Sequence, residues 1–350
     1  MSAPSVSIVI PCRNERGFIE GCLESIVANG YPLEDLEVLV VDAMSTDGTR
    51  ELLTRLVERY PFVRVIDNPA GVTPVALNLG IRAARGTVIV RIDGHAIIQP
   101  GYLVKCVTAL RAGKANNVGG VMQIVPQTAS LFGRAVAACL SHSFGAGGPR
   151  YRTGSRDPVL VDTVQGGCYD RSIFEEIGYF NERLRRSQDM EFNRRLKIHG
   201  GRILLLPDVV YVYYSRSSFV VFLRHNWTNG VWAILPFLYS DVTPVSFRHL
   251  VPLMFVVALT GALGLSLALP TVGIWPLALV AGPYAVVCLS SAIQMVWTRR
   301  EPLVALMSPF VFLSMHLCYG LGSCWGILKA IGISVRRMST TDNSSSVQAN

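Results

Sequence analysis

A carboxylate and an imidazole stand two residues apart in the stretch Arg91-Ile-Asp-Gly-His-Ala, directly after an apolar run. An extended turn at the end of a strand places Asp93 and His95 on one side, where both can reach a divalent cation that is bound to a diphosphate. The alternative is an ordinary Asp-Gly turn with a neighbouring histidine, which is a common structural arrangement.

A second acidic stretch, Val41 to Thr49, leaves an apolar run and enters a helical pattern. Asp42 is therefore expected at a strand end, where its carboxylate can accept hydrogen bonds from a base or a ribose. Asp47 lies near the start of the helix, where a carboxylate can instead stabilise the positive end of the helix dipole. We expect a ligand contact for Asp42 and leave both interpretations open for Asp47.

A third acidic stretch begins a helix at Ser187. Phe192 and Leu196 form an apolar pair four residues apart, which leaves the first-turn Asp189 free to point into a cleft. Asp189 is therefore the candidate general base. The structural alternative is that Asp189 and Glu191 only stabilise the helix N-terminus.

The elements that must position these residues are apolar runs that alternate with helical patterns. The expected strands are residues 5–10, 37–41, 63–66, 87–92, 161–168 and 202–206. The expected helices are residues 15–28, 46–59, 73–84, 171–177 and 188–199. This alternation is typical of a parallel α/β sheet, in which ligands collect beyond the carboxyl ends of the strands.

The alternation stops between Gln127 and Asp162, and residues 144–158 are rich in glycine. We expect residues 144–158 to form a mobile loop that acts as a lid when a ligand binds. Its Arg150 and Arg152 either approach phosphates or lie on a solvated surface.

Composition separates the first 250 residues from the rest of the chain. Half of the residues are apolar and the formal charge is +8, yet no dense Lys/Arg run with interleaved aromatics occurs. We therefore expect phosphate-bearing substrates and a membrane surface, and no nucleic acid. The eight cysteines form no close CxxC pair, which argues against a zinc site or a disulfide framework. The apolar run Val6 to Ile10 follows no basic region and does not fit a signal peptide.

Residues 251–333 contain few formal charges and offer about three membrane spans, near residues 250–269, 274–297 and 303–333. The positive-inside rule places Arg299 and Arg300 in the cytoplasm, together with the catalytic domain of a multi-pass protein in a bacterial-type cytoplasmic membrane. The third segment is long enough to be a bent or re-entrant hairpin instead. We predict a catalytic domain over residues 1–225, an interfacial linker over 226–249, the spans over 250–335 and a disordered tail over 336–350.

Five motifs in register resemble glycosyltransferase family 2, over roughly residues 5–224. They are the stretches 7–15, 41–49, 76–86 and 93–95, and the pair formed by Gly166-Gly167-Cys168 and Gln188-Asp189. Within that family, the stretches 143–145, 150–152 and 316–322 look similar to the exopolysaccharide subgroup of succinoglycan-type glucosyltransferases.

The resemblance implies a GT-A fold, with a Rossmann-like nucleotide-sugar-binding domain, and inversion at the anomeric carbon. It implies transfer of a sugar, glucose by the subgroup likeness, from a nucleotide-diphosphate donor such as a UDP-sugar to a lipid-linked saccharide in extracellular polysaccharide biosynthesis. Asp189 would accept the proton, while Asp93 and His95 would hold Mn²⁺ or Mg²⁺. The implied donor-binding residues are Pro11, Arg13, Glu15, Asp42, Asp47, Asn78, Arg85 and Asp93, and the implied acceptor-side residues are Gly166, Gly167 and Gln188.

Two departures from the family pattern keep rival functions open. His95 replaces the second acid of the usual Asp-x-Asp metal motif, and Gln188 replaces the acid of the usual Glu-Asp base motif. The nitrogen ligand suits manganese better than magnesium.

One alternative is a polyprenyl-phosphate sugar synthase, whose ionised acceptor needs no base. The other is a catalytically inactive scaffold that binds nucleotide sugars in the membrane.

Overall fold

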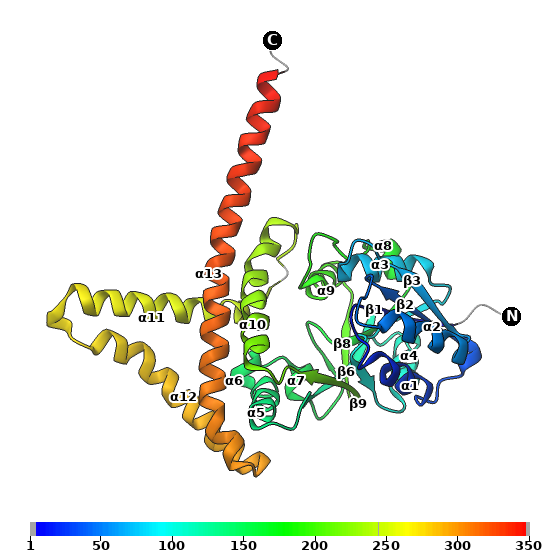
Figure 1. Cartoon of the computed structure of the whole chain (residues 1–350), viewed down its shortest axis with the longest axis horizontal. Helices are drawn as coiled ribbons and strands as arrows, with labels where there is room; N and C mark the ends of the chain where they lie inside the picture. The colour runs from blue at the N-terminus through cyan, green and yellow to red at the C-terminus, as the bar shows by residue number, and fades with distance from the viewer. Residues whose placement is uncertain (1–4, 244, 348–350) are drawn as a thin grey trace. The chain divides into compact units, whose positions relative to one another are not determined.

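The computed structural model describes residues 5–243 and 245–347, and the chain forms two compact units (Figure 1). Unit 1 consists of Met1–Gln127 and Leu140–Ser215, and unit 2 consists of Thr128–Cys139 and Arg216–Asn350. The chain thus enters unit 2 earlier than the predicted domain boundary at residue 225. The reason is that α10 (Phe219–Ile234) packs along α13 (Pro302–Val347), within unit 2.

Unit 1 is built on a mixed sheet, which has nine strands within the described part of the chain. The strands are β1 (Val6–Cys12), β2 (Leu36–Asp42), β3 (Val63–Asp67), β4 (Val88–Arg91), β5 (Ala96–Ile98), β6 (Asn117–Pro126), β7 (Val159–Leu160), β8 (Gln165–Asp170) and β9 (Ile203–Ser215). Their order is β3-β2-β1-β4-β8-β6-β9-β5, and β7 pairs with β9.

The predicted parallel arrangement holds for β1 to β4 and is wrong for β8, which runs antiparallel to both β4 and β6. β6 runs toward the carboxyl ends of the first strands, so the chain that follows returns to the sheet from that edge. The register pairs Val90 with Cys168 and Val88 with Asp170. Continued by three residues, this register brings the start of β8, Gln165, level with Asp93.

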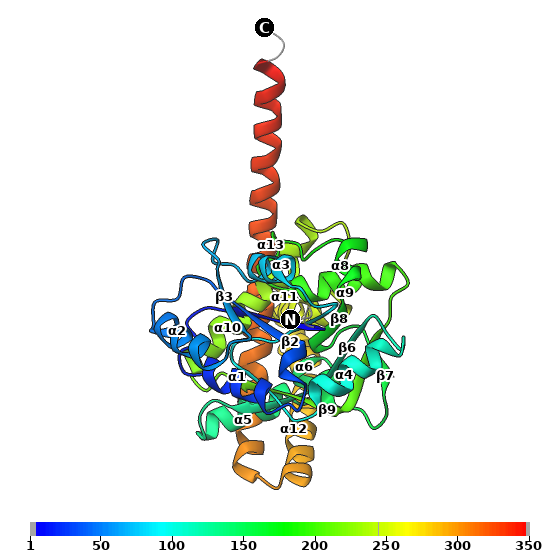
Figure 2. The same cartoon turned by 90° about the vertical axis from the view of Figure 1, so that its right-hand side faces the viewer.

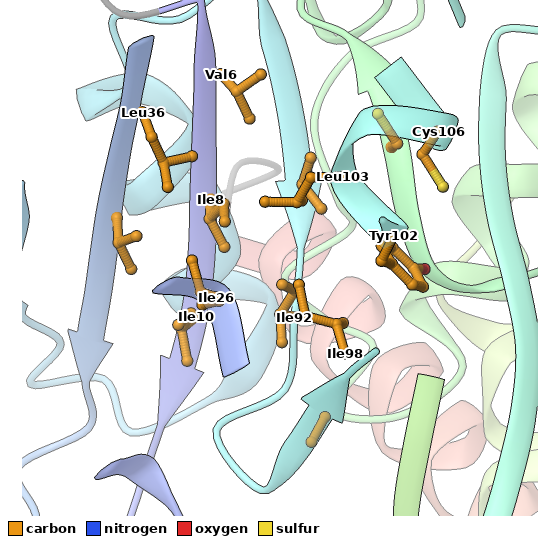
Figure 3. Close-up of a cluster of buried hydrophobic side chains, with 14 of the residues drawn as sticks. Val6, Ile8, Ile10, Ile26, Leu36, Ile92, Ile98, Tyr102, Leu103 and Cys106 are labelled. Carbon is orange, nitrogen blue, oxygen red and sulfur yellow. The ribbon is translucent and has the colours of Figure 1, made fainter. Parts of the chain in front are cut away.

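Helices cover both faces of the sheet (Figure 2). One face carries α1 (Ile19–Val27), α2 (Thr49–Arg59) and α4 (Tyr102–Arg111), and the other carries α3 (Thr73–Ala83), α8 (Ser172–Glu176) and α9 (Gln188–Ile198). Side chains alternate between the faces because a strand has a period of two. Ile8 and Ile10 of β1 pack in the core with Ile26 and Leu103 (Figure 3), whereas Val9 belongs to the core on the opposite face.

Residues 127–160, where no strand or helix was predicted, contain three helices within the described residues. Two of them reach into residues 144–158, so the predicted mobile loop is wrong in its secondary structure. The three helices are α5 (Leu131–Leu140), α6 (Ser143–Ala146) and α7 (Arg150–Thr153). In α5 the residues from Ala135 to Cys139 are all buried.

Among the described residues of unit 2, three helices are long and apolar enough to cross a membrane: Val251–Ala268 (α11), Trp275–Arg299 (α12) and Pro302–Arg336 of α13. The third is one continuous helix and not a re-entrant hairpin. Glycines permit its close approach to α10, since a Cβ on Gly230 would lie 1.9 Å from the Tyr319 carbonyl oxygen. The predicted interfacial linker is therefore largely a helix that packs against α13.

The C-terminal segment also differs from its prediction. A disordered tail was expected over residues 336–350, whereas α13 continues to Val347. Extending an existing helix is far easier than nucleating a new one. Residues 348–350 of the predicted tail lie outside the described residues.

Candidate active site

Asp42 ends β2 beside Cys12, the last residue of β1, and its side chain is fully buried. Its carboxylate accepts hydrogen bonds from the Ser45 backbone N–H at 3.0 Å and from the Ser45 hydroxyl at 2.5 Å. Arg50 Nη1 donates to it at 2.8 Å and to Asp67 at 2.9 Å. Asp42 therefore lies at the predicted edge of the sheet. Its carboxylate is already hydrogen-bonded to Ser45 and paired with Arg50.

The loop after β1 and the loop after β2 are joined by hydrogen bonds. The Asn14 N–H donates to the Ser45 hydroxyl at 2.8 Å, and the Asn14 side-chain oxygen accepts from the Thr46 N–H at 2.9 Å. Asn14 and Met44 both have positive φ angles, of 56° and 55°. Such backbone strain in residues other than glycine persists where the surroundings fix it, often at functional sites.

Asp47 belongs to the same loops and bonds mainly to the helix start. Its carboxylate accepts from the Thr49 hydroxyl at 2.5 Å and from the Thr49 and Arg16 backbone N–H groups at 3.1 and 3.3 Å. The Thr49 hydroxyl bond is the main cause that lowers the pKa of Asp47. These contacts are those of a residue that stabilises the start of α2. The neighbouring Arg13 extends to the Gly71 carbonyl oxygen at 3.3 Å, and Pro11 is part of β1.

Asp93 follows β4 and is held on every side. Its Oδ1 accepts from Arg91 Nη2 at 2.9 Å, and its Oδ2 accepts from Gln165 Nε2 at 2.8 Å. Its backbone N–H donates to the Tyr211 hydroxyl at 3.0 Å. Burial alone would raise the pKa of Asp93, but the Arg91 guanidinium and then His95 outweigh it, so the pKa lies below its usual value. Asp93 is therefore a carboxylate at neutral pH.

His95 Nδ1 lies 2.8 Å from Glu15 Oε1. A histidine that ligates a metal through Nε2 usually donates its Nδ1 hydrogen to such a carboxylate. Among the described residues no group of three or more His, Cys, Asp or Glu side chains could hold a metal ion. A cation held by Asp93 and His95 would therefore need further ligands from elsewhere, such as a bound diphosphate.

Asp189 lies in the first turn of α9, after Ser187, which has a φ of 64°. Its Oδ1 accepts from the Met190 N–H at 3.0 Å, and its Oδ2 lies 3.6 Å from Arg91 Nη1. The side chain is 28% exposed. Because Arg91 contacts both carboxylates, the structure brings Asp189 and Asp93 together across a single guanidinium.

The glycines of β8 are required by packing. Gly166 has a φ of +64°, and a Cβ there would lie 2.4 Å from the Tyr102 hydroxyl. A Cβ on Gly167 would lie 2.7 Å from the Asn117 side-chain oxygen and equally close to the Tyr169 ring. The adjacent Gln188 is buried at the start of α9.

Two predicted donor-binding residues are not brought to this edge. Asn78 is buried within α3, where its side chain donates to the Phe180 carbonyl at 2.9 Å and accepts from the Phe180 N–H at 3.0 Å. Arg85 precedes β4, and its Nε lies 3.0 Å from Glu37 near the start of β2. That is the amino end of the parallel strands, opposite the end that carries Asp42.

Three residues of the site were not among the predicted site residues, namely Arg91, Gln165 and Tyr211. Arg91 stands in the quoted motif, and its position two residues before Asp93 places it on the same side of an extended chain. Gln165 and Tyr211 carry no local signal. The antiparallel pairing of β8 with β4 brings Gln165 close to Asp93, and the antiparallel pairing of β9 with β5, which follows Asp93 in the chain, brings Tyr211 close to it.

Comparison with known proteins agrees with this fold. Residues 7–178 match Glycosyl transferase family 2. The succinoglycan biosynthesis protein ExoA of Rhizobium meliloti (strain 1021) is 29% identical over 324 residues, which cover 92% of this chain and 94% of that protein. A dolichyl N-acetyl-alpha-D-glucosaminyl phosphate 3-beta-D-2,3-diacetamido-2,3-dideoxy-beta-D-glucuronosyltransferase of Methanococcus voltae is 27% identical over 230 residues, which cover 64% of this chain and 71% of that protein.

The fold also has a counterpart among solved structures. The mannosyltransferase PcManGT from Pyrobaculum calidifontis, in complex with GDP-Man and Mn²⁺, matches with a TM-score of 0.54 and 19% identity. The match covers 95% of this chain and 87% of that one. At this identity the likeness concerns the fold alone, which is GT-A. By the match over residues 7–178 and the relatives named above, the chain carries a family 2 glycosyltransferase domain and is a glycosyltransferase.

Proposed function

We propose that this enzyme transfers a sugar, with inversion, from a nucleotide-diphosphate donor to a hydroxyl of a lipid-linked saccharide. The observation that carries the proposal is the contact of Arg91 with both Asp93 and Asp189, at 2.9 and 3.6 Å. An inverting displacement needs a proton acceptor on one side of the anomeric carbon and charge neutralisation on the other. Two carboxylates that share one guanidinium are close enough to serve these two sides.

The residues then divide the work as follows. Asp189, partly exposed in the first turn of α9, accepts the proton of the attacking hydroxyl. Asp93 and His95 hold the divalent cation, Mn²⁺ or Mg²⁺, and Glu15 orients the His95 ring. When bound, the cation neutralises the charge that develops on the leaving diphosphate. Asp42 and its partners Ser45 and Arg50 line the strand ends where the nucleoside binds.

The acceptor and the pathway are inferred from relatives and from unit 2. The name of the Methanococcus voltae relative gives it an acceptor sugar that is carried on dolichyl phosphate. The name of the Rhizobium meliloti relative assigns that protein to succinoglycan biosynthesis. Three apolar helices support a multi-pass protein in a bacterial-type cytoplasmic membrane, with the catalytic domain in the cytoplasm. We propose a role in extracellular polysaccharide biosynthesis with a UDP-sugar, such as UDP-glucose, as donor.

The proposal is tested by incubating membranes that contain the protein with a panel of radiolabelled nucleotide sugars and lipid-linked oligosaccharides. We expect label in the butanol-extractable lipid fraction for one donor, dependent on a lipid-linked saccharide and on Mn²⁺ or Mg²⁺. Membranes that contain Asp189→Asn serve as the control for background transferases. Label that forms equally with polyprenyl phosphate alone, or not at all, would overturn the proposal.

A further inference from the structure

The two terminal nitrogens of Arg91 contact the two site carboxylates. Arg91 ends β4, its Nη2 contacts Asp93 at 2.9 Å and its Nη1 lies 3.6 Å from Asp189. Its buried Nε has no hydrogen-bond partner within residues 5–243 and 245–347. Among the described residues, the guanidinium therefore makes one hydrogen bond and two ion pairs, all with the two site carboxylates.

Arg195 in α9 shows what a structural arginine of the same unit looks like. Its guanidinium donates to the carbonyl oxygens of Ile177, Gly178 and Tyr179, and to the carboxylate of Glu191 one turn earlier in the helix. It thereby holds a loop against a helix. Within the part of the chain that the structure describes, Arg91 makes no such bonds to backbone carbonyls, so its role is to be sought in the two carboxylates that it contacts.

The burial of Arg91 makes its positive charge unfavourable unless anionic groups pair with it. Its side chain is 13% exposed, and Tyr169 and Tyr211 lie close to it. A buried cation needs anionic partners, and Asp93 at 2.9 Å and Asp189 at 3.6 Å supply them.

The two carboxylates depend on Arg91 to different degrees. Asp93 keeps a hydrogen bond from Gln165 at 2.8 Å and a backbone bond to Tyr211 at 3.0 Å. In the described part of the chain, the Asp189 carboxylate has one hydrogen-bond partner, the N–H of the next residue Met190, and one ion-pair partner, Arg91 at 3.6 Å. Loss of Arg91 therefore frees Asp189 far more than it frees Asp93.

We propose that Arg91 is a positioning residue that fixes the base Asp189 relative to the donor-side carboxylate Asp93. The inference rests on the proposed function, in which Asp189 accepts the proton. A guanidinium presents its donors in a rigid planar fork, so one side chain can set the separation of two carboxylates. The lysine ammonium is a point charge on a flexible stem and cannot set that separation.

The test compares Arg91→Lys and Arg91→Ala with Arg59→Met in the purified full-length enzyme. Arg59 is an exposed arginine with long ion pairs to Glu20 and Glu24, so its loss controls for the change in net charge. A misplaced catalytic group costs about 10²-fold in rate. We expect a decrease of that order in kcat for both Arg91 variants, with the donor KM changed by less than about threefold, and wild-type kinetics for Arg59→Met.

Two further readouts separate positioning from a merely structural role. Methylguanidinium should restore at least about a tenth of the kcat that Arg91→Ala loses, and should leave Asp189→Asn unchanged, since only the former lacks a guanidinium. Groups that act as a unit are not additive, so Arg91→Ala combined with Asp189→Asn should be no slower than Asp189→Asn alone.

The inference is overturned if Arg91→Lys keeps the wild-type kcat, if the loss falls on the donor KM alone, or if the two substitutions multiply. Should Arg91→Ala fail to fold, as shown by its thermal unfolding, the kcat of Arg91→Lys decides. These failures differ from failure of the proposed function, in which Asp189→Asn is fully active or the wild-type enzyme transfers no sugar to a lipid-linked saccharide.

Discussion

Replacing Asp189 by Asn removes a base and leaves the shape of the side chain intact. The Oδ1 atom that accepts the Met190 N–H at 3.0 Å is retained in Asn. General-base assistance contributes about 10²- to 10⁴-fold in rate. At about 1.4 kcal/mol for each factor of ten, the barrier rises by about 3–6 kcal/mol. We therefore expect kcat to fall by two to four orders of magnitude, about the full contribution of a base.

The effect on folding should be much smaller than the effect on the barrier. The ion pair of Asp189 with Arg91 is long, at 3.6 Å, and Asp189 is 28% exposed, while Arg91 keeps its contact with Asp93. Partly exposed pairs of this kind contribute about 1 kcal/mol or less. Loss of activity with an almost unchanged thermal unfolding midpoint is thus the expected signature.

The assay measures transfer of radiolabelled sugar to the lipid-linked acceptor, together with calorimetric titration of the donor. Donor affinity should stay within about threefold of wild type, because the Asp189 carboxylate contacts Arg91 and Met190 and not the predicted cation ligands. Turnover of Asp189→Asn at the wild-type rate would refute the base assignment. It would favour a polyprenyl-phosphate acceptor, which is ionised already and needs no base.

Three other substitutions test the site and its scaffold. Asp93→Asn keeps an acceptor for Arg91 and loses a cation ligand, so calorimetry should show donor binding that no longer responds to Mn²⁺. Gly166→Ala meets a φ of +64° and a hydroxyl 2.4 Å from the new Cβ, which should lower stability by about 2–5 kcal/mol and the unfolding midpoint with it. In Glu37, burial raises the pKa, but hydrogen bonds from Ser7 and Arg85 outweigh it and lower the pKa overall. Glu37→Gln should therefore reduce stability at pH 7 and flatten its decline in acid, as thermal unfolding from pH 7 to pH 3 would show.

The sign of the Glu37 effect follows from linkage. A carboxyl group whose pKa is lowered on folding adds stability above its unfolded pKa, about 4.3, and that stability is lost as the pH falls through the folded pKa. Wild type should lose more stability than Glu37→Gln below about pH 4.3. An equal decline in both proteins would show that Glu37 contributes nothing to acid unfolding.

Matched controls exist for each of these substitutions. Asp208→Asn removes an exposed carboxylate that pairs with Lys105, and its donor binding should keep the wild-type response to Mn²⁺. Gly113 has a φ of +65° and open space at its Cβ position, so Gly113→Ala reports the backbone strain without the clash. Glu24→Gln changes an exposed glutamate and should leave the acid decline intact. If Gly166→Ala is no less stable than Gly113→Ala, the packing argument at β8 fails.

The first half of the sheet was predictable because its information is local. β1, β2 and β4 are apolar runs that end in polar residues, and the helices between them have an amphipathic period. Parallel strands that alternate with helices place their carboxyl ends at one edge, so Asp42 and Asp93 were expected there. The structure has both residues at the ends of β2 and β4.

The remainder depends on pairings that a single sequence does not reveal. Gln165 reaches Asp93 because β8 pairs antiparallel with β4. The residues of a strand do not show by themselves whether the strand pairs parallel or antiparallel. Asn78 and Arg85 lie in a motif that resembles the family pattern, yet Asn78 faces Phe180 and Arg85 faces Glu37. Polar residues in a motif serve packing and ion pairs as readily as ligands, and only tertiary contacts separate these roles.

The apolar helices illustrate the same limit. Composition alone identified the segments that are long and apolar enough to cross a membrane, because about 20 apolar residues suffice for each. Composition did not reveal that α13 is one unbroken helix, nor that α10 packs along it. The close approach at Gly230 is a property of two helices together.

The most direct test of the account is a structure of the full-length enzyme with a nucleotide-diphosphate sugar and Mn²⁺. The account predicts the cation on Asp93 and His95, the diphosphate as its other ligand, and Asp189 facing the anomeric carbon from the side opposite the leaving group. A cation bound without Asp93, or a sugar whose anomeric carbon lies out of reach of Asp189, would contradict it.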